Sequence, residues 1–248
     1  MNILGVIPAR YESSRFPGKP LADIHGKSMI MHVYDQSKKC ALLADVVVAT
    51  DDERILTHVL EHGGKAIITA KTHNSGTDRC REVLDKYATA EPIQAVINIQ
   101  GDEPYINPKQ IEQVAALLIN NKEVQIATLI KKIASINEPF NPNAVKVVTD
   151  SAGRALYFSR SEIPFIRNKK QPDSATNIDR FRHIGIYGYR SDILREISTL
   201  PAAPLEEAEK LEQLRWLWNG YVIHTAQTKY ESYGIDTPDD LLKLINIG

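Results

Sequence analysis

Short apolar runs alternate with amphipathic segments through the first half of the chain. Val, Ile and Ala dominate these runs, which is typical of strands buried on both faces. The predicted strands cover residues 3–7, 45–49, 66–69 and 95–99. Apolar residues at helical spacing predict helices over about 28–40, 52–62, 77–88 and 108–120. Regular alternation of strand and helix predicts a mostly parallel sheet with helices on both faces.

Two of the predicted helix boundaries carry local signals. Gly63-Gly64 follows the second helix as a C-terminal stop, because glycine adopts the backbone conformation that ends many helices. Asn107-Pro108 opens the fourth helix, with Asn at the N-cap and Pro at the first helical position. Both signals support the assigned helix lengths.

The pattern changes in the second half of the chain. Strands are predicted over 125–133, 144–149, 155–158, 183–190 and 221–227, with a tight turn at 150–153. Helices are predicted over about 205–218 and from about 238, and residues 167–180 form a polar loop. The middle section is therefore expected to add a smaller antiparallel piece to the main sheet, and not a separable domain.

Composition narrows the class of protein. The chain has 248 residues, 43% of them hydrophobic, which suffices for one large α/β domain with an insertion. A net charge of −1 gives no indication of nucleic-acid or membrane-surface binding. No segment reaches the roughly 18 apolar residues of a membrane span, and the N-terminus lacks signal-peptide features, so we expect a cytoplasmic protein. Cys40 and Cys80 lack metal-ligand spacing and are expected to be reduced thiols.

The loop after the first strand concentrates positive charge. Residues 8–20 contain Arg10, Arg15 and Lys19, with two prolines and a glycine that prevent helix formation. A loop at the carboxyl end of such a strand is where α/β sheets bind ligands. Guanidinium and ammonium groups match phosphate oxygens, so the loop predicts a polyphosphate site. The alternative is a solvated surface loop that happens to be basic.

Two further motifs offer carboxylates. Asp102 follows the strand at 95–99 directly, after a glycine that permits a sharp turn. Asp236 precedes Thr237-Pro238, a pattern that is also typical of a purely local helix N-cap. Mg²⁺ at a nucleotide site takes one or two carboxylates together with phosphates and water. The pair Asp102 and Asp236 therefore predicts a magnesium site.

At these motifs the chain resembles the 3-deoxy-manno-octulosonate (KDO) cytidylyltransferases, or CMP-KDO synthetases, over essentially its whole length. Single motifs recur in wider sugar nucleotidyltransferases, whereas the ordered set is specific. The matching segments are residues 8–11, 16–21, 48–51, 75–79, 100–104, 140–146, 155–160, 182–189, 211–215 and 236–238. The resemblance implies a Rossmann-like nucleotidyltransferase sheet with an antiparallel insertion, as one domain over 1–248.

The resemblance also implies the reaction. The family transfers CMP from CTP to the anomeric hydroxyl of KDO for lipopolysaccharide synthesis and releases pyrophosphate. Carried over by position, Arg10, Arg15 and Lys19 hold the triphosphate, and Arg10 and Lys19 stabilise the leaving pyrophosphate. Asp102 and Asp236 hold Mg²⁺ and complete the catalytic set. Ser75 and Gln100 are assigned to nucleotide or sugar hydroxyls.

The acidic sugar needs cations and hydrogen-bonding groups. The positions that match the family's sugar pocket are Arg79, Arg160, His183, Tyr187, Glu212 and Gln213. Each has a structural alternative. Arg79 could be an exposed helix cation, and Arg160 could cap a strand edge. Tyr187 and His183 could belong to the core, and Glu212 and Gln213 could be solvated beside the apolar stripe of their helix. The resemblance further implies a homodimer, with the insertion at roughly 140–200 supplying dimer contacts and part of the sugar pocket.

The sequence is compatible with two other functions. The same framework would serve a cytidylyltransferase for 8-amino-KDO or a sialic acid, or a catalytically silent nucleotide-sugar sensor. A dinucleotide oxidoreductase is disfavoured, because no Gly-x-Gly-x-x-Gly follows the first strand. Asp52 is interpreted as a helix cap, and Trp216 and Trp218 as core or interface residues.

Overall fold

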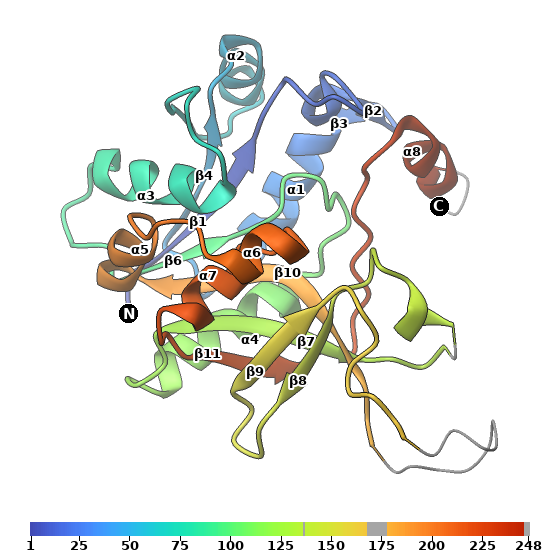
Figure 1. Ribbon diagram of the computed structural model, residues 1–248. Helices are drawn as coiled ribbons and strands as arrows, with labels where there is room; N and C mark the ends of the chain where they lie inside the picture. Colours follow the sequence, from blue (N-terminus) through green and yellow to red (C-terminus); the bar gives the residue numbers. More distant parts are fainter. Residues whose placement is uncertain (136, 168–177, 246–248) are drawn as a thin grey trace.

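Figure 1 shows the computed structural model of the chain, which describes residues 1–135, 137–167 and 178–245. The strands are β1 (Ile3–Ala9), β2 (Asp23–Ile24), β3 (Lys27–Ser28), β4 (Asp45–Thr50), β5 (Ala66–Ile68), β6 (Ala95–Asn98), β7 (Ile126–Lys132), β8 (Lys146–Thr149), β9 (Ala155–Ser159), β10 (Phe181–Arg190) and β11 (Ile223–Gln227). The helices are α1 (Met29–Lys38), α2 (Glu53–Glu61), α3 (Gly76–Lys86), α4 (Pro108–Asn120), α5 (Ser191–Ile197), α6 (Pro204–Glu209), α7 (Gln213–Trp218) and α8 (Pro238–Ile245), with 3-10 turns η1 (Lys19–Leu21) and η2 (Glu138–Phe140). Most of the predicted 167–180 loop, residues 168–177, lies outside the described residues.

The main sheet has the order β11-β7-β10-β6-β1-β4-β5. Parallel pairing joins β1 to β4 and β6, β4 to β5, and β7 to β11, whereas β10 runs antiparallel to β6 and β7. The β8–β9 pair joins the sheet through a short antiparallel contact between β8 and β10. The predicted fold class, a mostly parallel α/β sheet with a smaller antiparallel insertion, is confirmed.

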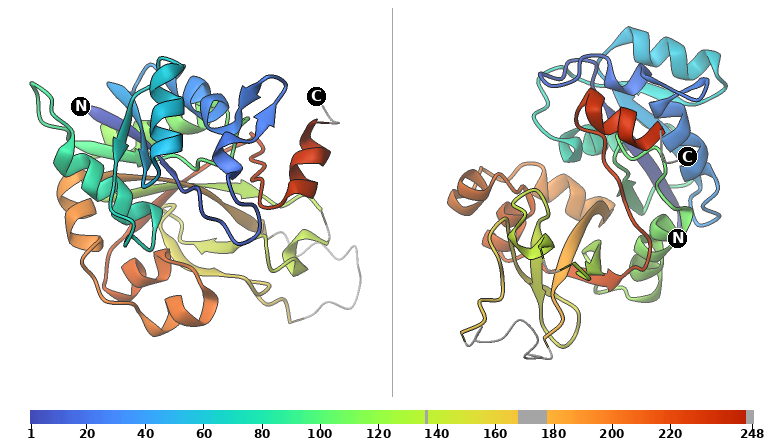
Figure 2. Two further views of the ribbon diagram at one scale, coloured as in Figure 1. Left: turned by 90° about the horizontal axis from the view of Figure 1, so that it is seen from above. Right: turned by 90° about the vertical axis from the view of Figure 1, so that its right-hand side faces the viewer.

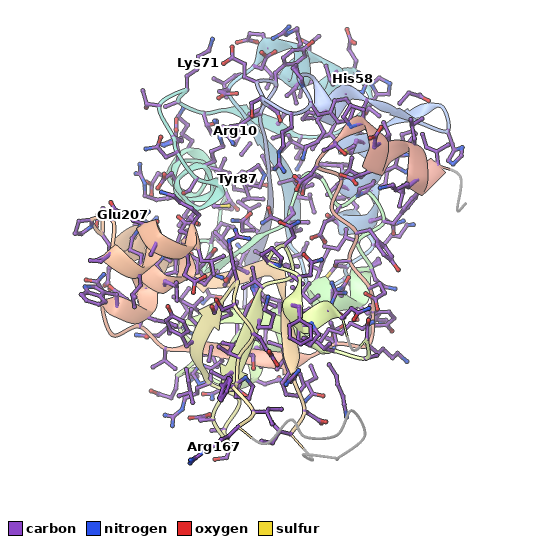
Figure 3. All side chains as sticks on the ribbon, turned by 45° about the vertical axis from the view of Figure 1, so that its right-hand side comes forward. Arg10, His58, Lys71, Tyr87, Arg167 and Glu207 are labelled. Carbon is purple, nitrogen blue, oxygen red and sulfur yellow. The ribbon has the colours of Figure 1, made fainter. Side chains whose placement is uncertain are left out.

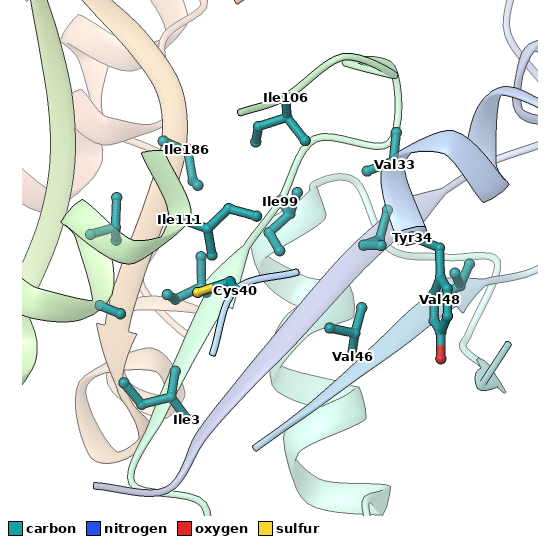
Figure 4. Packing of buried hydrophobic residues seen from close by; sticks show 14 of the residues in the cluster. Ile3, Val33, Tyr34, Cys40, Val46, Val48, Ile99, Ile106, Ile111 and Ile186 are labelled. Carbon is teal, nitrogen blue, oxygen red and sulfur yellow. The ribbon is translucent and has the colours of Figure 1, made fainter. Parts of the chain in front are cut away.

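Helices cover both faces of the sheet because the central strands alternate their apolar side chains. Ile3 and Ile7 of β1 pack on the face that carries α1, α2 and α4, and Leu4 and Val6 pack on the face that carries α3, α5 and α7. Figure 4 shows the first of these layers, with Val33 of α1 close to the strands. Both cysteines are buried and free, as expected.

The sequence signals at several boundaries are confirmed. Asn107 caps α4 with Pro108 at its first position, and Asp52 caps α2 by accepting a hydrogen bond from the Arg54 amide. Gly153 has a φ of +75° in the turn between β8 and β9. Trp216 is buried in the core and Trp218 is 58% exposed.

One predicted helix and two omissions need correction. The segment 205–218 is not one helix but two, α6 and α7, because Lys210 adopts a left-handed conformation with φ of +53°. The break places Glu212 at the N-cap of α7. Helix α5 and the β2–β3 hairpin were absent from the prediction, since both are short.

The C-terminal segment runs from β11, on the side of the sheet that carries the insertion (roughly residues 140–200), back to the loop at residues 8–20, here called the basic loop. After β11 the chain runs back toward β2 and β3, and α8 lies beside this hairpin in Figures 1 and 2. Ile24, Met29 and Ile235 form a small buried cluster there, against which Leu241 and Leu244 pack. This packing fixes the position of Asp236. No helix within the described ranges is long and apolar enough to cross a membrane.

Candidate active site

The site forms where β1 and β6 end side by side. The loop after β6 passes so close to the end of β1 that a Cβ on Gly101 would lie 2.6 Å from the Pro8 carbonyl oxygen. Only glycine allows this approach, which brings Asp102 beside the basic loop. Parallel strands thus deliver the two motifs to one edge of the sheet, as α/β folds commonly do.

A pocket of about 260 Å³ lies at this edge. Its lining brings together eight of the predicted site residues: Arg10, Arg15, Lys19, Ser75, Arg79, Gln100, Asp102 and Asp236. Arg10 is exposed at its rim, well away from Arg167 at the other end of the view in Figure 3. The pocket is also lined by four polar residues that no sequence pattern indicated, namely Glu12, Ser13, His73 and Asn74. In the sequence, Glu12 and Ser13 are marked only by their place within the basic loop, and His73 and Asn74 only by their place next to Ser75.

Lys19 connects the two predicted metal ligands. Its Nζ lies 2.7 Å from Asp102 Oδ2 and 4.0 Å from Asp236 Oδ1, and it donates to the Ile235 carbonyl oxygen at 2.7 Å. The Ile235 amide donates to the Asp102 carbonyl oxygen at 3.0 Å. These contacts hold the basic loop, the β6 loop and the C-terminal segment against one another.

Asp236 is not the helix cap that its spacing from Pro238 allowed. Thr237 precedes Pro238 directly, and its Oγ1 accepts a hydrogen bond from the Asp240 amide at 3.2 Å. The Asp240 carboxylate accepts in return from the Thr237 amide at 2.9 Å, which completes a capping box. Asp236 pairs with Arg15 instead, at 3.0 Å. Its carboxylate is therefore available to the pocket.

The two carboxylates suit a hard cation such as Mg²⁺. An ammonium group already lies between Asp102 and Asp236, so the pair accepts positive charge at that place. Within the part of the chain that the structure describes, no three His, Cys, Asp or Glu side chains gather as a metal site. A metal bound here would need phosphate oxygens and water as further ligands, which is the usual arrangement at nucleotide sites.

The N-terminus of α3 forms another wall. Ser75 caps the helix by accepting from the Asp78 amide at 3.2 Å, and Asp78 accepts in return from the Ser75 amide. Gly76 packs closely, since its Cβ would lie 3.3 Å from both Asn98 Nδ2 and Pro8 Cγ. The positive end of the α3 dipole therefore faces the pocket and favours an anionic ligand.

Arg79 is not an exposed helix cation. Its side chain is 2% exposed and pairs with Asp51 at 2.6 Å. The guanidinium also donates to Thr69 Oγ1 at 2.8 Å. Arg79 thus presents the edge of a buried ion pair to the pocket, and not a free charge.

The remaining five predicted residues do not line this pocket. They lie beyond Gln100, whose Nε2 donates to the Gly185 carbonyl oxygen of β10 at 2.9 Å. His183 and Tyr187 flank Gly185 on β10, and Arg160, Glu212 and Gln213 lie at the end of β9 and the start of α7. The structure therefore forms two neighbouring groups, one cationic and one around β10.

Burial controls the charge of the group around β10. It lowers the pKa of His183 to about 3, so the ring is neutral near pH 7 and contacts Thr128 Oγ1 at 2.9 Å. Burial also raises the pKa of Glu212, whose Oε2 accepts from Thr77 Oγ1 at 2.8 Å. Tyr187 packs against the rings of His183, Tyr189 and Trp216. Its hydroxyl is buried and has no hydrogen-bond partner among the described residues.

Arg160 is held at its place by backbone carbonyls. Its Nε donates to the Glu209 oxygen at 2.7 Å and one terminal nitrogen donates to the Pro142 oxygen at 3.0 Å. The carbonyl of Arg160 in turn accepts from the fully buried Lys146. Arg160 is thus part of a hydrogen-bond network that connects the end of β9 to α6. It does more than cap the edge of a strand.

Fold and site together define a nucleotidyltransferase that handles a polyphosphate. Residues 4–229 match the family described as Cytidylyltransferase. A 3-deoxy-manno-octulosonate cytidylyltransferase of Cytophaga hutchinsonii is 51% identical over 98% of this chain and 96% of the relative. One of Parabacteroides distasonis is 48% identical over 99% of this chain and 97% of the relative.

A solved structure agrees. A CMP:2-keto-3-deoxy-manno-octonic acid synthetase complexed with CTP superposes with a TM-score of 0.91. It is 44% identical to this chain, and the match covers 100% of this chain and 98% of that one. The chain belongs to the 3-deoxy-manno-octulosonate cytidylyltransferase family.

Proposed function

We propose that this enzyme transfers CMP from CTP to the anomeric hydroxyl of KDO and releases pyrophosphate. The observation that carries the proposal is the meeting of Arg10, Arg15 and Lys19 with Asp102 and Asp236 around one pocket. Close full-length similarity to named KDO cytidylyltransferases supports the same reaction. The product would supply lipopolysaccharide assembly.

Electrostatics and positioning would carry most of the catalysis. The sugar hydroxyl attacks the α-phosphorus and releases its proton to solvent water, while the bond to the bridging oxygen breaks and pyrophosphate leaves with its electron pair. Arg10 and Lys19 would neutralise charge on the phosphoryl oxygens and on pyrophosphate, while Arg15 and the α3 N-terminus hold the triphosphate. Fixing the reactants in one pocket lowers the entropic part of the barrier.

Asp102 and Asp236 would hold Mg²⁺. When bound, magnesium would lower the pKa of a nearby hydroxyl and neutralise phosphate charge. A hydroxyl made more acidic in this way would need no dedicated general base. We therefore propose that Asp102 and Asp236 act as ligands and not as proton acceptors.

The sugar would bind in the group around β10. Arg160 supplies positive charge for its carboxylate, and His183, Tyr187, Glu212 and Gln213 supply hydrogen bonds to hydroxyls. Ser75 and Gln100 stand between this group and the cationic pocket. For Arg79 we propose a narrower role in the pocket wall, because its guanidinium is already paired with Asp51.

The insertion exposes large apolar side chains that could form the contact of a homodimer. Phe140, Leu156 and Phe165 are 59%, 60% and 81% exposed, and all three belong to the insertion. Burial of exposed apolar side chains against a second protein is favourable. We propose that these residues contact a second copy of the chain.

The decisive experiment is pyrophosphate release by the purified protein with CTP, Mg²⁺ and KDO. Parallel reactions would contain 8-amino-KDO or a sialic acid, and a further one would contain EDTA. Release with KDO alone, abolished by EDTA, is expected. Release only with another sugar would overturn the assignment of KDO, and tight CTP binding without any turnover would favour a nucleotide-sugar sensor.

A further inference from the structure

An arginine outside the pocket stacks on the basic loop. The guanidinium carbon of Arg54 lies 3.3 Å from the centre of the Tyr11 ring, and Tyr11 directly follows Arg10. Neither Arg54 nor Tyr11 lines the pocket. A cation over an aromatic face at this distance is attracted by the ring's electrons.

The guanidinium of Arg54 is fixed in orientation by its own helix. Its Nε and one terminal nitrogen donate to the two carboxylate oxygens of Asp52, at 2.8 and 2.6 Å. Asp52 also accepts from the Arg54 amide at 3.0 Å as the N-cap of α2. A planar, two-point pair of this kind restricts rotation of the guanidinium. Helix α2 therefore presents a flat, oriented cation to Tyr11.

The Tyr11 ring also packs against Gly18 at the other end of the loop. A Cβ on Gly18 would lie 3.2 Å from Tyr11 Cζ and Oη, and Gly18 has a φ of +72°. The Gly18 amide donates to the Tyr11 carbonyl oxygen at 2.8 Å. Tyr11 and Gly18 thus close the loop, and their chain neighbours are Arg10 and Lys19.

We propose that Arg54 is a positioning residue for the triphosphate. It holds the Tyr11 ring against Gly18 and so sets the separation of Arg10 and Lys19 before CTP arrives. This inference rests on the proposed binding of CTP by the basic loop. It assigns to Asp52 and Arg54 a function that helix capping alone does not explain.

The test is a double-mutant cycle on CTP affinity. We would measure the dissociation constant of CTP by calorimetry for the wild type, Arg54→Ala, Tyr11→Leu and the double variant. Loss of an exposed cation–π contact weakens CTP binding about two- to fivefold in each single variant. The double variant is expected to bind CTP about as tightly as the single variant with the lower CTP affinity, because both changes remove the same contact.

Kinetics and controls separate positioning from other effects. The KM for CTP should rise in Arg54→Ala while kcat and the KM for KDO stay within twofold, and Tyr11→Phe should behave as the wild type. Lys71→Ala removes an exposed cation from the neighbouring loop and should leave CTP affinity unchanged. A role in stability alone would lower the melting temperature of Arg54→Ala without changing CTP affinity.

Three outcomes would overturn the inference. They are an unchanged dissociation constant in Arg54→Ala, additive losses in the double variant, and an equal loss in Lys71→Ala, which would indicate general charge attraction. Failure of the wild type to bind CTP would instead refute the proposed function, and the inference with it. The wild-type titration distinguishes these cases.

Discussion

The ammonium group of Lys19 compensates the negative charge of the two carboxylates in the pocket, Asp102 and Asp236. One ammonium group contacts a carboxylate, a second carboxylate and a backbone carbonyl that come from distant parts of the chain. Such a group screens the two acids from each other. The effect of removing one acid can therefore be predicted.

Asp102→Asn keeps the size of the side chain and removes its charge. Because metal and leaving-group stabilisation amount to several kcal/mol, turnover should fall by about 10²-fold or more. Pyrophosphate release measures the effect, and the thermal unfolding curve should stay close to that of the wild type. Asp239→Asn, an exposed acid in the first turn of α8, is the matched control and should retain full turnover. Near-normal turnover in Asp102→Asn would contradict the metal role.

His183 gives the fold a defined pH dependence. Its pKa is about 3 in the folded protein, below the ordinary value of about 6.5. Between these values the unfolded state binds the extra proton, so stability rises with pH and is lost as pH falls below about 6.5. His183→Gln removes this contribution. When the pH is lowered from 7 to 5, the wild type should therefore lose about 2 kcal/mol more unfolding free energy than His183→Gln loses. Urea titrations at both pH values test this, and equal losses would refute it.

At the scale of elements, the site depends on how closely two strand ends approach. Gly101→Ala would place a methyl group 2.6 Å from the Pro8 oxygen and force the loops after β1 and β6 apart. We expect a loss of about 1–3 kcal/mol in stability, together with a higher KM for CTP. Gly234→Ala is the control, since nothing lies within 4 Å of its Cβ. Equal effects of the two substitutions would argue against close approach as the cause.

The elements also show what sequence patterns resolve. β1, β4 and β6 were predictable because each is a short apolar run buried on both faces. The break between α6 and α7 was not, because the apolar stripe continues across it and lysine carries no signal for a left-handed conformation. Local spacing alone predicts Asp52 as the cap of α2. Before α8 the spacing fits both Asp236 and Thr237, and only the hydrogen bonds with Asp240 assign the cap to Thr237.

At the scale of the whole molecule, the insertion should govern association. Leu156→Asp places a charge on an exposed apolar side chain of β9 and should convert a homodimer into a monomer. Light scattering at micromolar concentration measures the mass directly. Leu60→Asp, on α2 and 52% exposed, is the control and should leave the mass unchanged. A monomeric wild type would refute the proposed dimer.

Long-range contacts mark the limit of prediction from sequence. The motifs around Arg10, Asp102 and Asp236 were recognisable, and parallel strands explain why the first two meet. The pairing of Arg79 with Asp51 and the stacking of Arg54 on Tyr11 had no signal, because both depend on packing between separate elements. The division of the predicted site residues into a cationic pocket and a group around β10, with Gln100 between them, also depends on packing. It follows from the position of β10 in the sheet, and no local sequence pattern specifies that position.

The C-terminal segment that carries Asp236 also affects the order in which the site can form during synthesis. Lys19 and Ile235 are 216 positions apart, yet they share a hydrogen bond in the middle of the site. During synthesis, the basic loop and the strands around it emerge long before their last partner. A nascent chain can thus build most of the sheet before Asp236 reaches the pocket, so under the proposed function we expect activity to appear only once the segment around Ile235 has docked.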